Sequence, residues 1–248
     1  MRYLKVLLLG LMAGVMIAFG GLTNVTLISR NLALAGNLLF VLGLLGICFF
    51  SFNLYTGKVG YVFNNKPAFL LDLLLMYIGN FIGAITIGYL IRVTSLYASL
   101  DETIMTIAIN KTNINQSNLL SLFILSLLCG ILVFLSVELY KREIHPLFKV
   151  VGIFLFISCF VICGFEHCIA NMFYFALSNS YFVYPLGSFL NLLIVTIGNS
   201  IGAILLYFIF YFIDYKKKLY LKIYMDIYIK YLLVLNHILK LHKILRVM

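Results

Sequence analysis

Two adjacent ionisable residues, Glu166 and His167, stand in a stretch of the chain that is otherwise largely apolar. An imidazole has an unperturbed pKa near ~6.5, so it can hold or release a proton at physiological pH. Neighbouring residues on a helix project about 100° apart, which predicts different roles for the two side chains. We expect His167 to meet a solute and Glu166 to be a buried anchor that accepts backbone hydrogen bonds or pairs at a contact between protomers. A neutral packing histidine is the alternative.

The cysteines do not form a recognisable catalytic or metal-binding set. The sequence has five cysteines, and the spacing of Cys159, Cys163 and Cys168 is not that of a zinc site. Packing between helices is the preferred interpretation. We therefore expect neither a metal nor a cofactor. Lys5 and Lys149 lie near helix ends, where they would concentrate anions at an entrance or extend as anchors to the membrane surface.

Composition decides which elements must position these residues. Of 248 residues, 64% are hydrophobic and 10% are charged, whereas soluble domains are about 45–50% apolar and about 25% charged. A chain with so few charges cannot cover a globule with polar surface, so a multi-pass membrane protein is predicted. The net charge of +10 then indicates orientation in the membrane and not nucleic-acid binding.

Six apolar stretches are long enough to cross a bilayer, which takes about 20 residues. Lysine and arginine favour the cytoplasmic side of membrane proteins. A cytoplasmic N-terminus places fifteen of the eighteen basic residues inside and leaves Arg30, Arg92 and Lys111 outside. We therefore expect both termini on the cytoplasmic side of the plasma membrane. The six stretches are Leu4–Ile28, Leu32–Phe52, Ala68–Ile91, Leu119–Val137, Leu147–Phe165 and Val183–Ile213.

The sequence contains an internal repeat. Ile78–Ile85 and Ile197–Ile204 match at seven of eight positions, and Gly46…Asn53 corresponds to Gly164…Asn171 at an offset of 118. Each repeat, about 1–100 and 117–215, holds three spans, and an odd number inverts the second copy. Inverted repeats are typical of transporters and channels, with a site near the midplane at broken helices. We expect breaks after the second and fifth stretches, facing each other across one pore.

The segment after the channel domain 1–215 combines basic and apolar residues. Lys218, Lys222, Asp226 and Lys230 recur every four residues, which predicts an amphipathic helix. Residues 216–248 are therefore interpreted as a cytoplasmic tail that lies on the lipid surface. A seventh span and solvated disorder of the last residues remain alternatives.

Four motifs resemble those of the formate/nitrite transporter family. The most specific is Gly164–Phe173, which contains Glu166, His167 and Asn171. The others are Leu54–Gly57, Val195–Gly202 and Ala13–Gly20, and the resemblance covers roughly Leu4–Tyr215. The chain departs from the family at Asn53, where many members have Asp or Glu, and at Phe134, where formate channels have a pore-facing Asn.

The resemblance implies an all-α, aquaporin-like bundle of six helices with broken second and fifth helices. It further implies a homopentamer in which each protomer has its own pore for small monovalent anions: formate, nitrite, hydrosulfide and, in some members, lactate or acetate. Asn80 and Asn199 are expected to support the structure. The resemblance also implies roles for single residues. Phe40, Leu44 and Phe160 would form the cytoplasmic constriction and Leu54 the outer one, and Thr56 could face the central His167. Asn171 would belong to the pathway, and Lys5 and Lys149 would lie in the vestibules.

Two routes would bring an anion past an apolar constriction, where desolvating a charge is expensive. Protonated His167 could stabilise the anion, or a proton could be shared or donated so that a near-neutral acid crosses; the second route is preferred. An aquaporin-like channel for neutral solutes is the main alternative, although no proline here follows an asparagine. An intramembrane enzyme lacks a second acid–base set, and a structural scaffold is the remaining alternative.

Overall fold

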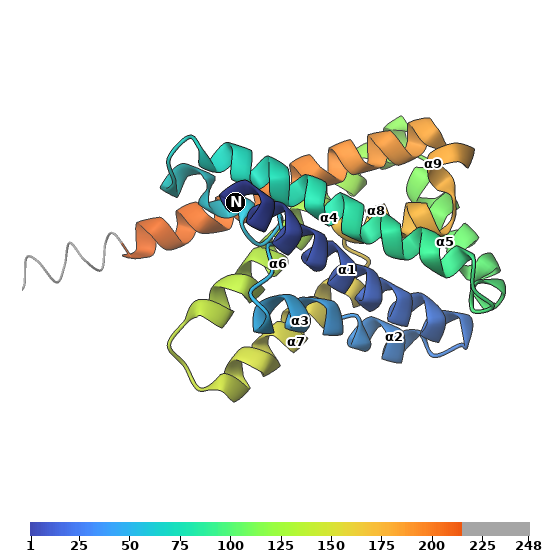
Figure 1. The fold of residues 1–248 in the computed structure, drawn as a ribbon, viewed down its shortest axis with the longest axis horizontal. Helices are drawn as coiled ribbons and strands as arrows, with labels where there is room; N and C mark the ends of the chain where they lie inside the picture. Colours follow the sequence, from blue (N-terminus) through green and yellow to red (C-terminus); the bar gives the residue numbers. More distant parts are fainter. Residues whose placement is uncertain (215–248) are drawn as a thin grey trace, which may run out of the picture. The chain divides into compact units, whose positions relative to one another are not determined.

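The computed structural model describes residues 1–214. The chain divides into two compact units, Met1–Leu206 and Tyr207–Met248. The first unit is described below; of the second, residues 207–214 are the last turns of a helix. The predicted amphipathic tail lies outside the described residues. Residues 1–214 form helices and connecting loops, without a strand (Figure 1).

The helices of the described part follow one another with short connections. Two of them, η1 and η2, are 3-10 helices. In chain order they are α1 (Arg2–Ser29), α2 (Ala33–Leu39), α3 (Leu42–Phe49), η1 (Val59–Asn64), α4 (Phe69–Arg92), η2 (Tyr97–Ser99), α5 (Asp101–Thr112), α6 (Gln116–Lys141), α7 (Pro146–Ile162), α8 (Cys168–Leu177), α9 (Ser180–Val183) and the helix Pro185–Asp214.

Four helices of the described part are long and apolar enough to cross a membrane, namely α1, α4, α6 and Pro185–Asp214. They correspond to the first, third, fourth and sixth predicted stretches. The second and fifth stretches form shorter helices instead. The second is α2 and α3, and the fifth is α7, after which the chain leaves the helical conformation before α8 begins.

The helices α3 and α7 end in the same way. After α3, Ser51 has a φ of 55°, and after α7, Gly164 has a φ of 68°. In both places the next amide N–H reaches back five residues, from Phe52 to the carbonyl of Ile47 and from Phe165 to that of Phe160. This left-handed turn is a common helix stop, and glycine adopts it without steric penalty. Each turn releases the chain into a loop.

Close backbone contacts hold the long helices together in pairs. A Cβ added to Gly14 of α1 would lie 2.1 Å from the carbonyl oxygen of Asn80 on α4. In the same way, a Cβ on Gly130 of α6 would lie 2.1 Å from the carbonyl oxygen of Asn199 on the last long helix. Only glycine permits backbones to approach this closely, so these glycines serve the packing of the long helices.

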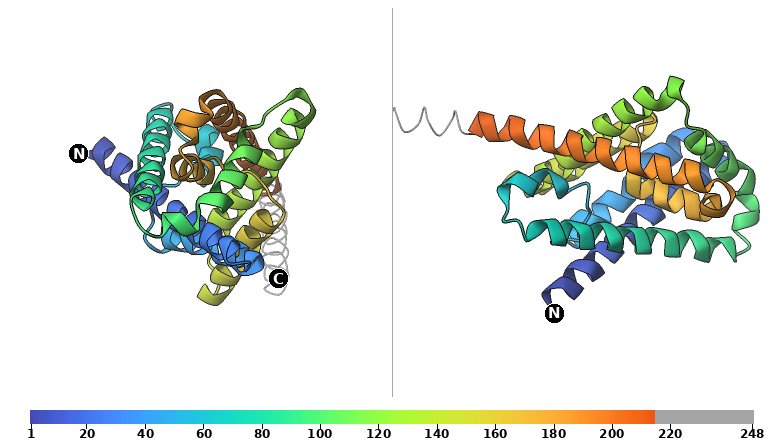
Figure 2. Two further views of the ribbon diagram at one scale, coloured as in Figure 1. Left: turned by 90° about the vertical axis from the view of Figure 1, so that its right-hand side faces the viewer. Right: turned by 90° about the horizontal axis from the view of Figure 1, so that it is seen from above.

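The short helix α8 lies at the centre of the first unit. All ten of its residues are buried, and it contacts both α1 and α4. The helices α2 and α3 pack on α1 and also contact α7 (Figure 1). Figure 2 shows the bundle from two further directions, with α1 crossing α4 at an angle. The loop before α8, which carries Glu166 and His167, is thereby placed inside the unit.

Candidate functional site

His167 and Thr56 face each other inside the first unit. The distance from Thr56 Oγ1 to His167 Nε2 is 3.0 Å, and the two residues are 0% and 2% exposed. They belong to the two loops that follow α3 and α7, 111 residues apart in the chain. The structure therefore brings together the two residues that the resemblance paired.

The hydrogen bond to the other ring nitrogen of His167 shows which nitrogen carries the proton when the ring is neutral. His167 is the N-cap of α8, and its Nδ1 accepts the backbone N–H of Ala170 at 3.2 Å. An accepting Nδ1 carries no proton, so the proton of a neutral imidazole is on Nε2. His167 then donates to Thr56 Oγ1, and the hydroxyl proton of Thr56 is free to point elsewhere.

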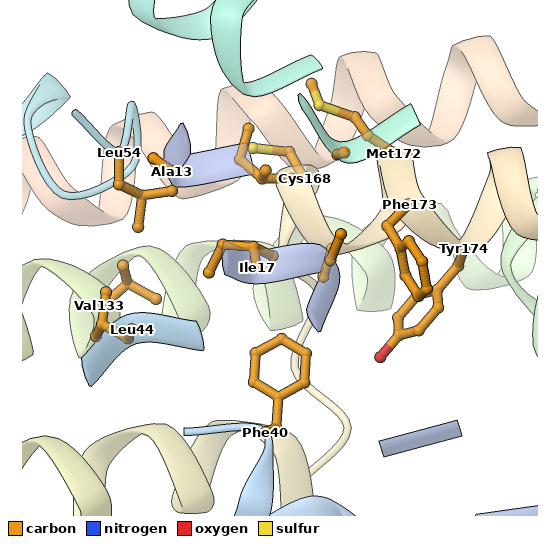
Figure 3. Packing of buried hydrophobic residues seen from close by; sticks show 14 of the residues in the cluster. Ala13, Ile17, Phe40, Leu44, Leu54, Val133, Cys168, Met172, Phe173 and Tyr174 are labelled. Carbon is orange, nitrogen blue, oxygen red and sulfur yellow. The ribbon is translucent and has the colours of Figure 1, made fainter. Parts of the chain in front are cut away.

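Two aromatic rings lie beside this pair. The ring of Phe160 is 6.0 Å from that of His167 and 5.6 Å from that of Phe40, which it meets edge to face. Both phenylalanine side chains are almost fully buried, as are Leu44 and Leu54. All four belong to the hydrophobic core, of which Figure 3 shows Phe40, Leu44 and Leu54.

Glu166 forms an ion pair within its own chain. Lys111 Nζ lies 2.7 Å from both carboxylate oxygens, and the side chains are 17% and 13% exposed. Asn171 Nδ2 donates to Glu166 at 2.7 Å and to Asn191 Oδ1 at 2.8 Å. The carboxylate is thus an anchor, as expected, but side chains and not backbone groups hold it. Sequence reasoning missed Lys111, whose only signal was its position among the few basic residues predicted outside.

Two asparagines hold the two loops with the same three bonds. The Nδ2 of Asn80 donates to the carbonyls of Gly10 and Asn53, and its Oδ1 accepts the N–H of Tyr55. In the same way, the Nδ2 of Asn199 donates to the carbonyls of Ser126 and Glu166, and its Oδ1 accepts the N–H of Cys168. Buried backbone groups in irregular segments need such partners. Both asparagines are fully buried and hold the loops, as expected of supporting residues.

These bonds define which residues of the two loops correspond. Asn53 matches Glu166, because both carbonyls are held by the asparagine, and Leu54 then matches His167. The helix stops Ser51 and Gly164 agree with this register. The sequence comparison paired Asn53 with Asn171, which is wrong for the loops by five residues. The error arose because Glu166 and Asn199 are 33 residues apart whereas Asn53 and Asn80 are 27 apart, so one offset cannot match both the loops and the long helices.

Two cavities lie at opposite ends of α6, which has 26 residues and is about 39 Å long. The first, here called the His167 cavity, has a volume of about 310 Å³, and its lining includes Asn110 and Lys111 of α5, shortly before α6 begins. The second, the Leu54 cavity, has about 260 Å³ and lies where α6 ends. The His167 cavity is lined by residues that include Phe40, Phe160, His167, Lys111, Glu166 and Asn171. The Leu54 cavity is lined by residues that include Leu54, Lys58, Tyr140 and Lys141.

This arrangement places the two expected constrictions at different cavities. Phe40 and Phe160 line the His167 cavity, and Leu54 lines the other one. In the predicted orientation, the His167 cavity faces outwards, so Phe40 and Phe160 belong to the outer side and Leu54 to the cytoplasmic side. The reason is the chain path: α2 begins where α1 ends, so Phe40 lies only two turns from that end.

The predicted entrance lysines do not line either cavity. Lys5 is exposed near the start of α1. Lys149 lies 5.4 Å from the ring centroid of Tyr140, which itself lines the Leu54 cavity. The lysines on the cavity walls are Lys111 at one end and Lys58 and Lys141 at the other. Phe134 packs 4.9 Å from the ring of Tyr61 and is absent from both linings.

Comparison with known proteins agrees with this architecture. The family described as formate/nitrite transporter matches residues 1–213. The chain belongs to the formate/nitrite transporter family. Its fold resembles that of a solved structure described as a pentameric formate channel with formate bound, with a TM-score of 0.70 and 24% identity over 86% of this chain and 98% of that one. A structure described as an FNT family ion channel gives a TM-score of 0.66 and 22% identity over 86% and 89% of the two chains.

Two curated proteins are also similar to this member of the formate/nitrite transporter family. A probable formate transporter of Methanothermobacter thermautotrophicus is 28% identical over 240 residues, covering 80% of this chain and 84% of that one. The uncharacterized transporter YwcJ of Bacillus subtilis is 37% identical over 139 residues, which is 52% of each chain. The chain thus spans about half the length of that second relative. The two curated relatives are described as transporters, and the two solved structures are described as channels.

Proposed function

We propose that the protein is a channel or transporter for small monovalent anions: formate, nitrite or hydrosulfide. It acts as a homopentamer in the plasma membrane, with both termini cytoplasmic. The observation that carries this proposal is the buried Thr56–His167 pair between two otherwise separate cavities. A polar pair inside an apolar partition offers a passing anion hydrogen bonds at the point where water is excluded. The pentameric channel of similar fold supports the assembly.

An inverted pair of three-span repeats accounts for the architecture. The matched bonds of Asn80 and Asn199 and the matched turns at Ser51 and Gly164 support this symmetry. Both loops then meet near the membrane midplane, where non-helical backbone is tolerated only inside protein or beside a water-filled cavity. Each pore is built by one protomer from its own two loops.

The His167–Thr56 pair assists passage by donating hydrogen bonds and not as a standing cation. The neutral ring holds one proton, on Nε2, and donating it completely would leave an unfavourable imidazolate. An imidazolium would need a proton on Nδ1, which would displace the Ala170 N–H that caps α8. We therefore infer that the proton that neutralises the anion enters with it from solution. His167 and Thr56 donate hydrogen bonds while the near-neutral acid passes Phe40 and Phe160.

Lysines at both cavities support the attraction of anions. Lys111 uses two of its three N–H donors on Glu166, so one donor remains for a solute in the His167 cavity. Lys58 has no ion-pair partner among residues 1–214 and lines the Leu54 cavity. Cations beside a cavity raise the local concentration of anions.

The proposal is tested with the purified full-length protein in liposomes. The flux of formate, nitrite and hydrosulfide is measured at one acidic and one neutral pH. Flux should rise as the pH falls, because more of each anion is accompanied by a proton. His167→Phe should abolish most of the flux. His145→Phe is the matched control, because His145 is an exposed N-cap of α7 away from both cavities.

Two results would contradict the proposal. If none of the three anions crosses faster than in protein-free liposomes, the assignment as an anion channel is wrong. If flux is independent of pH and unchanged in His167→Phe, the role of the histidine is wrong although the protein conducts anions.

A further inference from the structure

Three polar side chains form a directed chain of hydrogen bonds in the wall of the His167 cavity. The Tyr174 hydroxyl donates to Asn24 Oδ1 at 3.3 Å, and Asn24 Nδ2 donates to Asn37 Oδ1 at 2.8 Å. All three residues line the cavity. They come from α8, α1 and α2, so the chain of bonds crosses three helices. None of these three residues belongs to the four family motifs, although the motif Gly164–Phe173 ends next to Tyr174.

We propose that Asn37 is an oxyanion-binding residue of the His167 cavity, activated by Asn24 and Tyr174. This inference rests on the proposed function and adds a selectivity element to it. The ligands are small oxyanions that accept N–H hydrogen bonds, such as carboxylates and nitrite. The group that binds them is the side-chain amide of Asn37, and the other two residues are positioning residues that orient it.

The direction of these hydrogen bonds leaves the N–H donors of Asn37 facing the cavity without a partner among residues 1–214. Asn37 Oδ1 is occupied by Asn24, and none of residues 1–214 accepts a hydrogen bond from Asn37 Nδ2. Asn37 is half-buried, whereas Asn24 and Tyr174 are buried. Both N–H groups of Asn37 are therefore available to a solute. Because consecutive hydrogen bonds of one sense polarise one another, the terminal N–H groups become better donors.

The lysine beside the chain of hydrogen bonds is itself part of an ion pair. Lys111 Nζ lies 5.8 Å from the centroid of the Tyr174 ring. A cation on that face stabilises the electron-rich ring, but the ammonium group is already paired with Glu166. The lysine–glutamate pair is nearly neutral at a distance. An anion in the cavity therefore needs neutral donors as well, and Asn37 supplies them.

Asn37 lies close to the phenylalanine constriction. It lies on α2 three residues before Phe40, the C-cap of that helix, whose backbone is still helical, so both side chains lie on one face. Both residues line the cavity. An anion that leaves water for the phenylalanine constriction can exchange part of its hydration shell for the amide of Asn37. A side-chain amide replaces water well for an oxyanion, whereas the sulfur of hydrosulfide is a weak acceptor.

The inference predicts a selectivity change and not a general loss. Asn37→Leu keeps the branched shape of the side chain and removes the donors, so formate and nitrite flux should fall about five-fold. Hydrosulfide flux should stay within about two-fold of the unaltered protein, since sulfur gains little from the amide. Flux is measured in liposomes from the initial rates for all three anions. Asn37→Gln should recover most of the formate flux, because it keeps an amide on the same helix face.

A second, milder variant separates the loss of the hydrogen bonds from damage to the fold. Tyr174→Phe removes only the hydroxyl group, and it should change the formate-to-hydrosulfide ratio in the same direction by a smaller factor. Asn113→Leu is the matched control, since Asn113 is an exposed asparagine outside the cavity lining. Asn113→Leu should leave all three fluxes unchanged. Thermal unfolding of each variant establishes that the folded protein is compared.

The outcomes separate this inference from the proposed function. Anion flux in the unaltered protein, with all three anions slowed equally by Asn37→Leu, would overturn the role of Asn37 and leave the channel assignment standing. Unchanged formate flux in Asn37→Leu would also overturn it. Absence of anion flux in the unaltered protein would instead reject the proposed function itself.

Discussion

Leu54 and His167 occupy matching positions in two loops that are held by the same bonds. Asn80 bonds the backbone on both sides of Leu54, and Asn199 bonds the backbone on both sides of His167. One loop thus presents an apolar side chain and the other an imidazole. The loops share a scaffold, and the side chains make the two halves of the site chemically different.

The first prediction separates the capping role of His167 from its donor role. In His167→Asn, the shorter side chain can still cap α8, because asparagine is a favoured N-cap, but it loses the contact with Thr56. Formate flux in liposomes should fall about tenfold or more. His167→Phe should lose the same flux and also about 1 kcal/mol of stability, because the cap is lost. Wild-type flux in His167→Asn would show that the Nε2 donor is unnecessary.

The second prediction concerns the apolar side chain at the matching position. Leu54→Ala should raise formate flux, because a smaller side chain thins the partition next to the Leu54 cavity. The stability should fall by about 3 kcal/mol, as for other large-to-small changes in a core. Leu100→Ala is the control, since Leu100 is fully buried and lines neither cavity. It should lower stability similarly without raising flux; equal flux in both variants would argue against a constriction at Leu54.

The third prediction tests the equivalence of the two supporting asparagines. Asn80→Leu and Asn199→Leu each leave two backbone groups of a loop unpaired, one carbonyl and one N–H, because the third partner is a helix carbonyl that keeps its helical bond. Each unpaired group costs about 1–3 kcal/mol, so each variant should be destabilised by about 2 kcal/mol or more. The losses in thermal or denaturant unfolding should be similar in the two variants. Asn65→Leu, which removes one exposed bond to the Tyr61 carbonyl, should have little effect.

The fourth prediction concerns the ion pair between Lys111 and Glu166. Lys111→Met leaves the mostly buried carboxylate without its cation, which should lower the unfolding free energy by about 3 kcal/mol. Glu166→Gln in the same chain removes the uncompensated charge and should restore most of that stability. A double-mutant cycle measures the coupling. Additive effects would mean that the two charges do not depend on each other.

The fifth prediction addresses helix packing. Gly14→Ala places a methyl group against the backbone of α4, which cannot move without displacing Asn80. It should be destabilising by about 2 kcal/mol or more and should also reduce flux. Gly152→Ala is the comparison, because the nearest atom there is Cδ2 of Leu139, the end of a flexible side chain. Similar unfolding temperatures for both variants would contradict the close approach of α1 and α4.

The membrane helices and the central pair were predictable from the sequence because their signals are local. A run of apolar residues in α1 or α4 is sufficient to mark a span, whatever surrounds it. The motif around His167 and the short motif around Thr56 are each contiguous, so the resemblance identified both residues. The asparagines in the two repeated glycine motifs were predicted as supports for the same reason, although their three bonds each were not.

The partners of Glu166 and the sides of the constrictions could not be predicted in this way. Lys111 lies 55 residues before Glu166, and nothing in its surroundings marks it as the partner. The cavity that Phe40 lines was not predictable either, because the depth of a side chain depends on where its helix begins and how it tilts. The register of the two loops was misjudged because the repeats differ in length between their helices.

The sequence by itself determined the class of the protein, the family and the apolar spans, and it predicted a central role for His167. These follow from hydrophobic length and from residues that are adjacent in the chain. Only the tertiary structure decided that Thr56 lies 3.0 Å from His167 Nε2, and that Asn24, Asn37 and Tyr174 share one cavity wall. Such contacts join helices far apart in sequence, and they depend on crossing angles and side-chain directions that arise only when the helices pack.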